Sequence, residues 1–350
     1  MRELFSQEIV EHSQVGEVRR IIGALSRALG FTEIQSAKLA TAVSEAATNI
    51  LKHGMGGEIL VRSLNFSGVP GIEILALDKG PGIENLRKAM EDGFSTTGSL
   101  GVGLGAIKRS AEIFDIYSLP DKGTALLFRV YSKNVPRNNI KPRYFAIGAV
   151  SIPKHGEEIY GDGWGVEQDM NRAIFIIVDG LGHGGAAATV SQEALYLFRK
   201  HMNKKPSEII KILHEKLKHT VGCAAGITEV SIKEKALSFC GIGNTSARVV
   251  MLNDFKSFIS HNGIVGYRIS KITDYTQPLP VDEKPWALVL YTDGLSSNWN
   301  IDSYPGLLTK HPSLIAGILY RDYGRKNDDV TIVVAKPIKF TSKNYKETLY

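Results

Sequence analysis

The sequence predicts an α+β protein of two domains, and three observations carry this prediction. The chain has 350 residues, and at about 150 residues per domain this length suits two domains that each bury a core. Residues 132–143 hold two prolines and three asparagines without apolar periodicity, which is typical of a linker. Apolar strand-like and helical segments alternate on both sides of it. We expect domains at residues 1–131 and 144–337, a linker at 132–143 and a basic tail at 338–350.

Composition excludes several classes of protein. Hydrophobic residues make up 43% and charged residues 22% of the chain, which excludes wholesale disorder and collagen-like structure. No apolar run approaches the ~18 residues needed to span a bilayer, and the acidic N-terminus does not resemble a signal peptide. The two cysteines, Cys223 and Cys240, have no metal or redox spacing. We therefore expect a reducing, cytoplasmic location and no membrane partner.

The net charge of +6 lies mainly in the linker and the tail. Residues 131–143 contain four basic residues and no acidic one, and residues 336–350 contain four lysines and one glutamate. A nucleic-acid-binding protein carries its excess charge on a folded face. We therefore expect no nucleic-acid partner.

The first domain predicts a sheet with helices on one face. A capping box at Thr32–Gln35 starts the first long helix, and apolar residues then recur at helical spacing from Leu39 to Ile50. We expect Gly54 to end this helix in a left-handed conformation. Strands are expected at 59–63, 72–77 and 124–130. A glycine-rich stretch at 98–105 opens a second helix, with Leu104, Ile107, Ala111 and Phe114 on one side.

The second domain predicts stacked sheets with helices outside them. Its helices are expected at 186–201 and 206–218. Its strands are expected at 145–152, 173–178, 224–231, 236–241, 247–251, 287–291 and 330–335.

Polar and glycine-rich segments of the first domain suggest a nucleotide site. Glu45, Asn49 and His53 share one helix face, because a step of four residues drifts by only ~40°. That trio alone also fits an ordinary solvated face. The segment Asp78-Lys-Gly-Pro-Gly82 directly follows an apolar strand, where its glycines allow a tight turn against a ligand. Gly98–Gly105 precedes a helix, where backbone N–H groups bind anions.

These motifs, in this order, make residues 10–130 resemble the GHKL (Bergerat) ATP-binding fold of histidine kinases, gyrase, Hsp90-type chaperones and anti-sigma serine kinases. The stretch Phe94–Gly105 is most similar to the switch-type serine kinases of the bacterial stress response. The resemblance implies that Asn49 holds Mg²⁺ against the phosphates of ATP, that Asp78 binds the adenine amine with Thr124 nearby, and that Glu45 is the base toward a serine or threonine hydroxyl. Gly80 and Gly82 would shape the adenine pocket, and the phosphates would be capped by Gly101, Gly103, Leu104 and Gly105.

Two alternatives stay open for the first domain. A degenerate ATP-binding module without transfer activity is the less favoured interpretation. A histidine kinase would need a phospho-acceptor histidine on a helix upstream, and only ~30 residues precede the first expected long helix, which disfavours that class.

Four aspartates of the second domain follow apolar strands or lie in tight glycine turns. They are Asp162, Asp179, Asp293 and Asp328. A carboxylate in such a place is costly to desolvate unless it is paired or bound to a metal. A single Asp-Gly is usually just a turn, but four oxygen ligands suit a pair of Mg²⁺ or Mn²⁺ ions about 4 Å apart.

The second domain resembles metal-dependent phosphatases of type 2C, which have an α-β-β-α fold, in the sporulation and stress-response branch. The similar stretches are Gly161-Asp162, Val178–Gly184, Gly241–Thr245, Tyr291–Gly294 and Asp328–Thr331. The resemblance implies that Asp179 bridges both metals, with the Gly180 carbonyl as a ligand and Asp162, Asp293 and Asp328 completing the shells. Asp329 is a weaker candidate ligand, and no basic residue clearly matches the phosphate-binding arginine of eukaryotic members.

Four further side chains are weighed against simpler roles. His183 lies in a glycine-rich turn, and a direct metal role is the less favoured interpretation. His261 is either structural or substrate-facing. Trp164 and Trp286 are expected to be packing residues.

The expected function is a bifunctional enzyme of a bacterial partner-switching, stress-response pathway. One domain would phosphorylate and the other would dephosphorylate serine or threonine of STAS-domain regulatory proteins, in a stressosome-like assembly, with ATP, Mg²⁺ and Mn²⁺ as cofactors. The alternative is a serine/threonine phosphatase whose first domain only binds ATP or a partner. A non-enzymatic scaffold is disfavoured because both sets of catalytic residues are present.

Overall fold

The computed structural model describes residues 4–66, 68–90, 103–133, 143–157, 159–280 and 285–338. These residues form two compact units, one on each side of residues 134–142, and each unit is described by itself. The predicted limits of the linker and of the tail stay predictions. In the described residues, no helix is long and apolar enough to cross a membrane.

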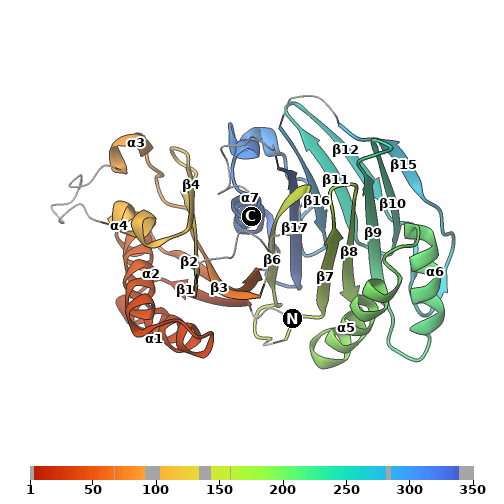
Figure 1. The fold of residues 1–350 in the computed structure, drawn as a ribbon, viewed down its shortest axis with the longest axis horizontal. Coiled ribbons are helices and arrows are strands. Elements are labelled where there is room, and N and C mark those ends of the chain that lie inside the picture. Colours follow the sequence, from red (N-terminus) through yellow and green to blue (C-terminus); the bar gives the residue numbers. More distant parts are fainter. Residues whose placement is uncertain are drawn as a thin grey trace. The chain divides into compact units, whose positions relative to one another are not determined.

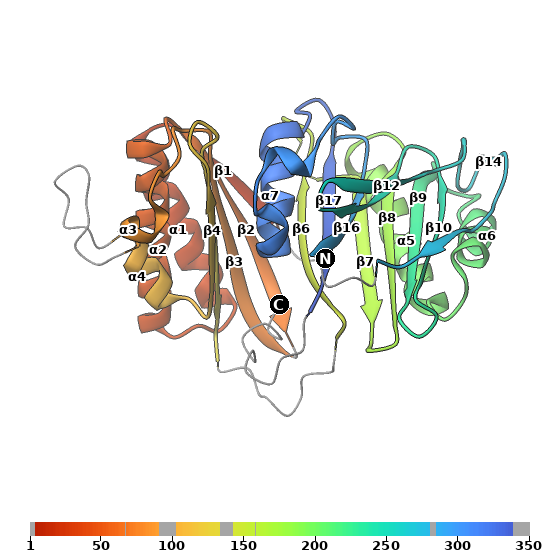
Figure 2. The same cartoon turned by 90° about the horizontal axis from the view of Figure 1, so that it is seen from above.

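The first unit is an antiparallel sheet with helices on one face, as predicted (Figures 1 and 2). Its strands run in the order β1-β2-β3-β5-β4. The helices are α1 (His12–Ala28), α2 (Glu33–His53), α4 (Gly103–Ser110) and the short α3 (Leu86–Ala89). The strands are β1 (Leu4–Ile9), β2 (Gly57–Phe66), β3 (Val69–Asp78), β4 (Ile113–Ser118) and β5 (Thr124–Tyr131). The predicted apolar stripe of α2, from Leu39 to Ile50, is buried in the core.

The start of α2 confirms the capping-box prediction, but its end does not follow the predicted geometry. The Gln35 N–H donates to Thr32 Oγ1 at 3.2 Å, and the Gln35 side chain accepts from the Thr32 N–H at 3.0 Å. Gly54 is right-handed, with φ −89°, and the left-handed residues are Met55 and Gly56. Glycine is needed at 54 for space, because a Cβ there would lie 2.6 Å from Asp78 Cβ.

Two other expectations for this unit are wrong. The glycine-rich helix ends at Ser110, and Phe114 lies on the unpredicted strand β4, although both Ala111 and Phe114 do pack on the core. A further long helix, α1, precedes α2 and buries Val18 and Ile22. This helix was not among the expected elements, and its presence upstream of α2 removes the argument against a histidine kinase.

The second unit confirms the prediction of stacked sheets with helices outside. One sheet has the order β15-β10-β9-β8-β7 and the other β12-β11-β16-β17-β6. The strands of the first sheet are β7 (Asp162–Gln168), β8 (Arg172–Gly180), β9 (Cys223–Ser231), β10 (Ala236–Ile242) and β15 (Tyr275–Pro278). Those of the second are β6 (Phe145–Ile152), β11 (Ser246–Met251), β12 (Asp254–Ile259), β16 (Trp286–Tyr291) and β17 (Val330–Pro337). A two-stranded ribbon joins β13 (Gly263–Ile264) to β14 (Arg268–Ile269).

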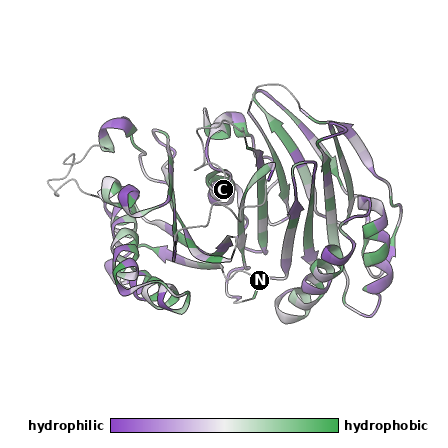
Figure 3. Cartoon of the chain, in the orientation of Figure 1, coloured by the Kyte–Doolittle hydropathy of each residue, from purple (hydrophilic) through white to green (hydrophobic). Residues whose placement is uncertain are grey.

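Two apolar layers hold the second unit together. Side chains such as Phe145, Phe175 and Leu288 fill the space between the sheets. Helices α5 (Gly184–His201) and α6 (Pro206–Lys216) pack on the outer face of the first sheet, and α7 (Pro312–Tyr323) lies beside β6 and β17 (Figure 1). Helices α5 and α6 carry both polar and apolar colours in Figure 3, as expected of helices with one buried face. Trp164 and Trp286 pack on this core, as predicted.

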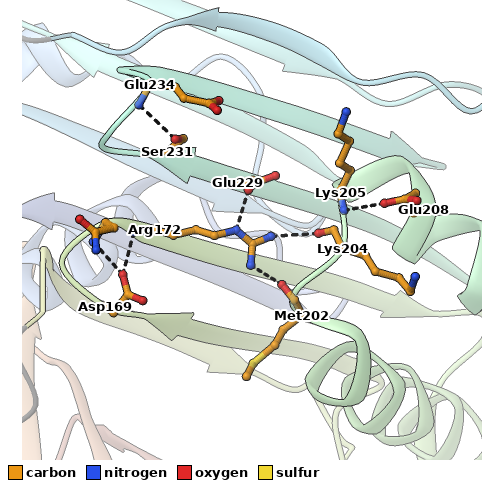
Figure 4. A network of polar contacts seen from close by, with 10 residues as sticks. Asp169, Arg172, Met202, Lys204, Lys205, Glu208, Glu229, Ser231 and Glu234 are labelled. Carbon is orange, nitrogen blue, oxygen red and sulfur yellow. Dashed lines mark hydrogen bonds and ion pairs between the residues drawn. The ribbon is translucent and has the colours of Figure 1, made fainter.

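Arg172, at the start of β8, ties the first sheet to the turn between α5 and α6 (Figure 4). Its Nε donates to Glu229 Oε1 of β9 at 2.6 Å, and its other nitrogens donate to the carbonyls of Met202 and Lys204. These bonds fix the helical layer against β8, the strand that carries Asp179 near its end.

Candidate functional sites

The first site is a cavity of about 1270 Å³ in the N-terminal unit. It lies between α2, the end of β3, the start of β5 and the start of α4. Seven of the residues predicted from the sequence line it: Glu45, Asn49, Asp78, Gly82, Gly103, Leu104 and Thr124. His53 also lines it, whereas Gly101 lies outside the described residues.

Asp78 is held in the wall of this cavity by backbone donors. Its Oδ1 accepts from the Gly80 N–H at 2.9 Å and from the Thr124 N–H at 3.0 Å. The turn after Asp78 requires glycine at 82, where φ is +74° and a Cβ would lie 2.0 Å from the Leu119 carbonyl oxygen. The turn therefore presents a fixed carboxylate to the cavity.

The start of α4 lies close to the polar face of α2. A Cβ on Gly103 would be 3.4 Å from Glu45 Oε2 and 3.7 Å from Asn49 Nδ2. Glu45 and Asn49 are one helical turn apart and both line the cavity. Gly105, two residues after Gly103 in α4, is buried. A carboxylate and an amide thus face backbone N–H groups at a helix start, which is an arrangement suited to phosphate groups.

Sequence reasoning missed several polar residues of this wall, two of them around a short helix. Asn85 and Lys88, around the short helix α3, also line the cavity. Their signal was weak, because a lone lysine and asparagine in a polar segment are typical of any loop.

The second site is built where the two sheets of the C-terminal unit end together. Asp162 starts β7 and is paired in register with Asp179 near the end of β8. Gly180 is the last residue of β8. Asp293 follows β16, and Asp328 precedes β17 of the other sheet. The Thr292 hydroxyl joins the two sheets by donating to Asp162 Oδ2 at 2.8 Å.

The electrostatics of these carboxylates show that they lie near one another. Burial, and then the charge of Asp179, raise the pKa of Asp162 well above its usual value. Burial, and then the charge of Asp293, raise the pKa of Asp179 to about 7. Burial and the charge of Asp328 raise the pKa of Asp293. Each carboxylate is therefore costly to ionise unless a cation compensates it.

The residues present fit divalent cations in their chemistry. All the candidate donors are oxygen atoms, as Mg²⁺ and Mn²⁺ prefer. Asp162 Oδ1 is buried and has no hydrogen-bond partner among the described residues. As the side chains stand, no three His, Cys, Asp or Glu residues of the described ranges enclose a point where an ion could sit.

Two residues around this site have roles that the sequence did not indicate. Asn244 Nδ2 donates to Asp293 Oδ2 at 2.6 Å and also bonds the carboxylate of Asp179. Asp329 is 6% exposed and accepts from the backbone N–H groups of Lys154 and Gly161, at 2.7 and 2.5 Å. Asp329 thus fixes the backbone just before Asp162.

The two histidines considered in the sequence make other contacts. His183 Nδ1 lies 3.0 Å from Glu157 Oε1, and its side chain is 64% exposed. His261 Nε2 is 2.9 Å from the Tyr275 hydroxyl. Neither contact involves one of the four aspartates.

Comparison with known proteins finds a matching family for each unit. Residues 10–130 match the family described as "Histidine kinase-like ATPase domain", and residues 169–337 match "Stage II sporulation protein E (SpoIIE)". The serine/threonine-protein kinase RsbT of Bacillus subtilis (strain 168) is 41% identical over 102 residues, which are 29% of this chain and 77% of the relative. The anti-sigma F factor of Thermoanaerobacter sp. (strain X514) is 32% identical over 117 residues, 32% of this chain and 82% of the relative.

One solved structure shares the fold of part of the chain. It is described as "The bacterial stressosome: a modular system that has been adapted to control secondary messenger signaling". The similarity covers 55% of this chain and 98% of that chain, with a TM-score of 0.50 and 21% identity.

Proposed function

We propose that this chain, which belongs through its N-terminal unit to the histidine kinase-like ATPase family, is an enzyme with two opposed activities. The N-terminal unit is similar to RsbT and the anti-sigma F factors, and it is joined to a SpoIIE phosphatase domain. The N-terminal unit phosphorylates a serine or threonine of a partner protein. The C-terminal unit removes phosphate from such a residue.

The cavity lined by Glu45 and Asn49 is the site proposed for transfer. Asp78, fixed by two backbone N–H groups, binds the adenine amine. Asn49 supplies an oxygen ligand for Mg²⁺ beside the phosphates. Glu45 accepts the proton of the partner's hydroxyl while that oxygen takes the γ-phosphoryl group, and ADP leaves. Such transfer depends mostly on positioning and on neutralising charge. The Glu45 carboxylate can position the hydroxyl, and the backbone N–H groups at the start of α4 can stabilise the charge of the phosphates.

The four aspartates at the ends of the stacked sheets are the site proposed for hydrolysis. A bound pair of divalent ions supplies an activated water and polarises a phosphoryl oxygen. Asp179 and the Gly180 carbonyl would hold the pair, with Asp162, Asp293 and Asp328 as the other ligands. Asn244 holds two of these carboxylates in place. The unpartnered Asp162 Oδ1 is the observation that carries this proposal most directly.

Turnover of p-nitrophenyl phosphate tests the phosphatase site. Wild-type protein should hydrolyse it in Mn²⁺ or Mg²⁺ and not in EDTA, and Asp179→Asn should lower the rate about a hundredfold or more. Asp254→Asn, on an exposed position of β12, is the matched control and should leave the rate unchanged. Equal activity in the Asp179→Asn variant would show that hydrolysis occurs elsewhere.

The partners proposed are STAS-domain regulatory proteins of a partner-switching pathway in the cytoplasm. This proposal is supported by the similarity to RsbT and the anti-sigma F factors, and by two cysteines that are free and buried. A pull-down with phosphosite mapping, comparing wild type with Glu45→Ala and Asp179→Asn, tests it. Glu45→Ala should enrich the unphosphorylated partner and Asp179→Asn the phosphorylated one. Recovery of the same unmodified proteins with all three would contradict it.

A further inference from the structure

A second hollow of the N-terminal unit lies between α1 and α2, which run side by side in Figures 1 and 2. Its volume is about 490 Å³. From α1 it is lined by Arg19, Arg20, Gly23 and Arg27, and from α2 by residues that include Glu33 and Ser36. We refer to it as the arginine groove.

The arginine groove carries three guanidinium groups without a matching set of carboxylates. In the part of the chain that the structure describes, Arg19, Arg20 and Arg27 make no ion pair, and Glu33 is the one acidic residue among those that line the groove. Gly23 lies at the centre of the three, within two turns of each. A Cβ there would be 3.5 Å from Arg27 Nη1, so Arg27 folds back over the glycine. The groove therefore keeps a net positive charge in a small space.

Ser36 lines the groove and has an unused hydrogen-bonding group. Its side chain is 5% exposed, and its Oγ has no hydrogen-bond partner among the described residues. Ser26, which is buried in the same helix pair, does donate to the Gly23 carbonyl at 3.1 Å. A buried hydroxyl without a partner is unfavourable unless a ligand satisfies it.

The arginine groove is distinct from the nucleotide cavity. Nine residues separate Ser36 from Glu45 on α2, which is 900° of rotation, so the two side chains leave opposite faces of the helix. No residue lines both hollows. A ligand in the groove would therefore bind to the same helix as Glu45 and Asn49 but on its other side.

We propose that the arginine groove binds a small phosphate-bearing anion. Guanidinium groups bind phosphate oxygens in pairs, and Ser36 can donate to a further oxygen. The volume lies in the range of small-molecule sites, which are about 300–1,000 Å³. A docked protein segment would need large apolar or aromatic anchors, whereas the uncharged residues of the lining are small. This inference does not depend on the proposed kinase or phosphatase activity.

Calorimetric titration of the full chain with inorganic tripolyphosphate in EDTA tests the proposal. Wild type should bind, and the double variant Arg20→Gln/Arg27→Gln should bind at least about tenfold more weakly. Arg199→Gln, which removes an exposed arginine of α5, is the matched control and should bind as wild type does. Asn49→Ala should also bind, because it alters the nucleotide cavity alone. An unchanged melting temperature of the double variant separates lost binding from lost folding.

Ser36→Ala distinguishes a ligand contact from a packing role. If Ser36 donates to the anion, the affinity should fall about threefold to tenfold, and Ser36→Thr should restore part of it. A more stable protein with unchanged affinity would contradict the contact.

Three results would overturn the arginine groove as a phosphate site. They are no binding by the wild type, equal binding by the double variant, or tighter binding of a polyglutamate peptide than of tripolyphosphate through the same arginines. The last result would assign the groove to an acidic protein segment instead. Hydrolysis of p-nitrophenyl phosphate, measured separately, decides the proposed phosphatase function whatever the titration shows.

Discussion

At the scale of single residues, the carboxylates of the C-terminal site destabilise the fold but suit the binding of divalent cations. Asp162 is buried and Asp179 and Asp293 are partly buried near one another, and desolvation is the main cause of each raised pKa. A fold optimised for stability alone would not place three carboxylates there. Bound divalent cations would compensate the negative charge of these carboxylates and offset the cost of their desolvation.

Asp179→Asn should stabilise the protein in EDTA at pH 8. The folded-state pKa of Asp179, about 7, lies above the usual value of 3.8, so the protonated form stabilises the fold. That stabilisation is complete below the unfolded pKa and is lost as the pH rises through about 7. The asparagine variant has no such loss, so its unfolding free energy at pH 8 should exceed that of wild type by about 1–3 kcal/mol.

Urea unfolding in EDTA at pH 5 and pH 8 measures this effect. The difference between the variant and the wild type should shrink at pH 5, and addition of Mn²⁺ should stabilise the wild type more than the variant. A variant that is less stable than wild type at pH 8 would contradict the account of this carboxylate.

Asp329→Asn should weaken the loop that positions Asp162. The carboxylate uses one oxygen for the Lys154 N–H and the other for the Gly161 N–H, and an amide offers only one acceptor. One buried N–H is left unpaired, which costs about 1–3 kcal/mol. The melting temperature and the rate of p-nitrophenyl phosphate turnover should both fall. If stability and turnover stay at wild-type values, the two backbone bonds do not hold this loop.

At the scale of elements, the end of α2 and the end of β3 are fitted to each other. Gly54, which follows α2, lies so close to Asp78, the last residue of β3, that a Cβ does not fit, although the conformation of Gly54 is allowed for any residue. The position of the Asp78 carboxylate thus depends on how α2 ends.

Gly54→Ala should therefore displace Asp78 without a backbone penalty at residue 54. We expect a loss of about 1–3 kcal/mol in stability from overpacking and a nucleotide affinity at least about tenfold lower. Gly16→Ala, in α1 where a Cβ meets nothing within 4 Å, is the control and should stabilise the protein by about 0.5–1 kcal/mol. Calorimetric titration with ATP and Mg²⁺ measures the affinity. Wild-type binding by the Gly54→Ala variant would show that this close approach is unimportant.

Elements with a strong local signal were predictable, and those fixed by distant contacts were not. The capping box of α2, the apolar strands of both sheets and the aspartates after them follow from local patterns. Strand β12 is mostly exposed, with only Phe258 buried, so it lacks the apolar run that marks a strand. Residues Asn244 and Asp329 act through partners 49 and 168 residues away. No local spacing indicates such bonds.

At the scale of the whole molecule, the two proposed catalytic sites are built from separate units with separate cores. Asn49 and Asp179 share no element, and each site is lined by residues of its own unit. Substitutions in one site should therefore leave the chemistry of the other intact.

Paired variants test this independence. Asn49→Ala should lower ATP–Mg²⁺ affinity at least about tenfold while p-nitrophenyl phosphate turnover stays at the wild-type rate. Asp179→Asn should do the reverse. Loss of both activities in either single variant would contradict two independent sites.

A crystal structure with Mn²⁺ and a non-hydrolysable ATP analogue tests the central claim most directly. We predict anomalous density for manganese between Asp162, Asp179, Asp293 and Asp328, and the nucleotide bound against Asn49 and Asp78. Four aspartates that stay apart without manganese, or an analogue bound away from those two residues, would contradict the claim that one chain both adds and removes phosphate.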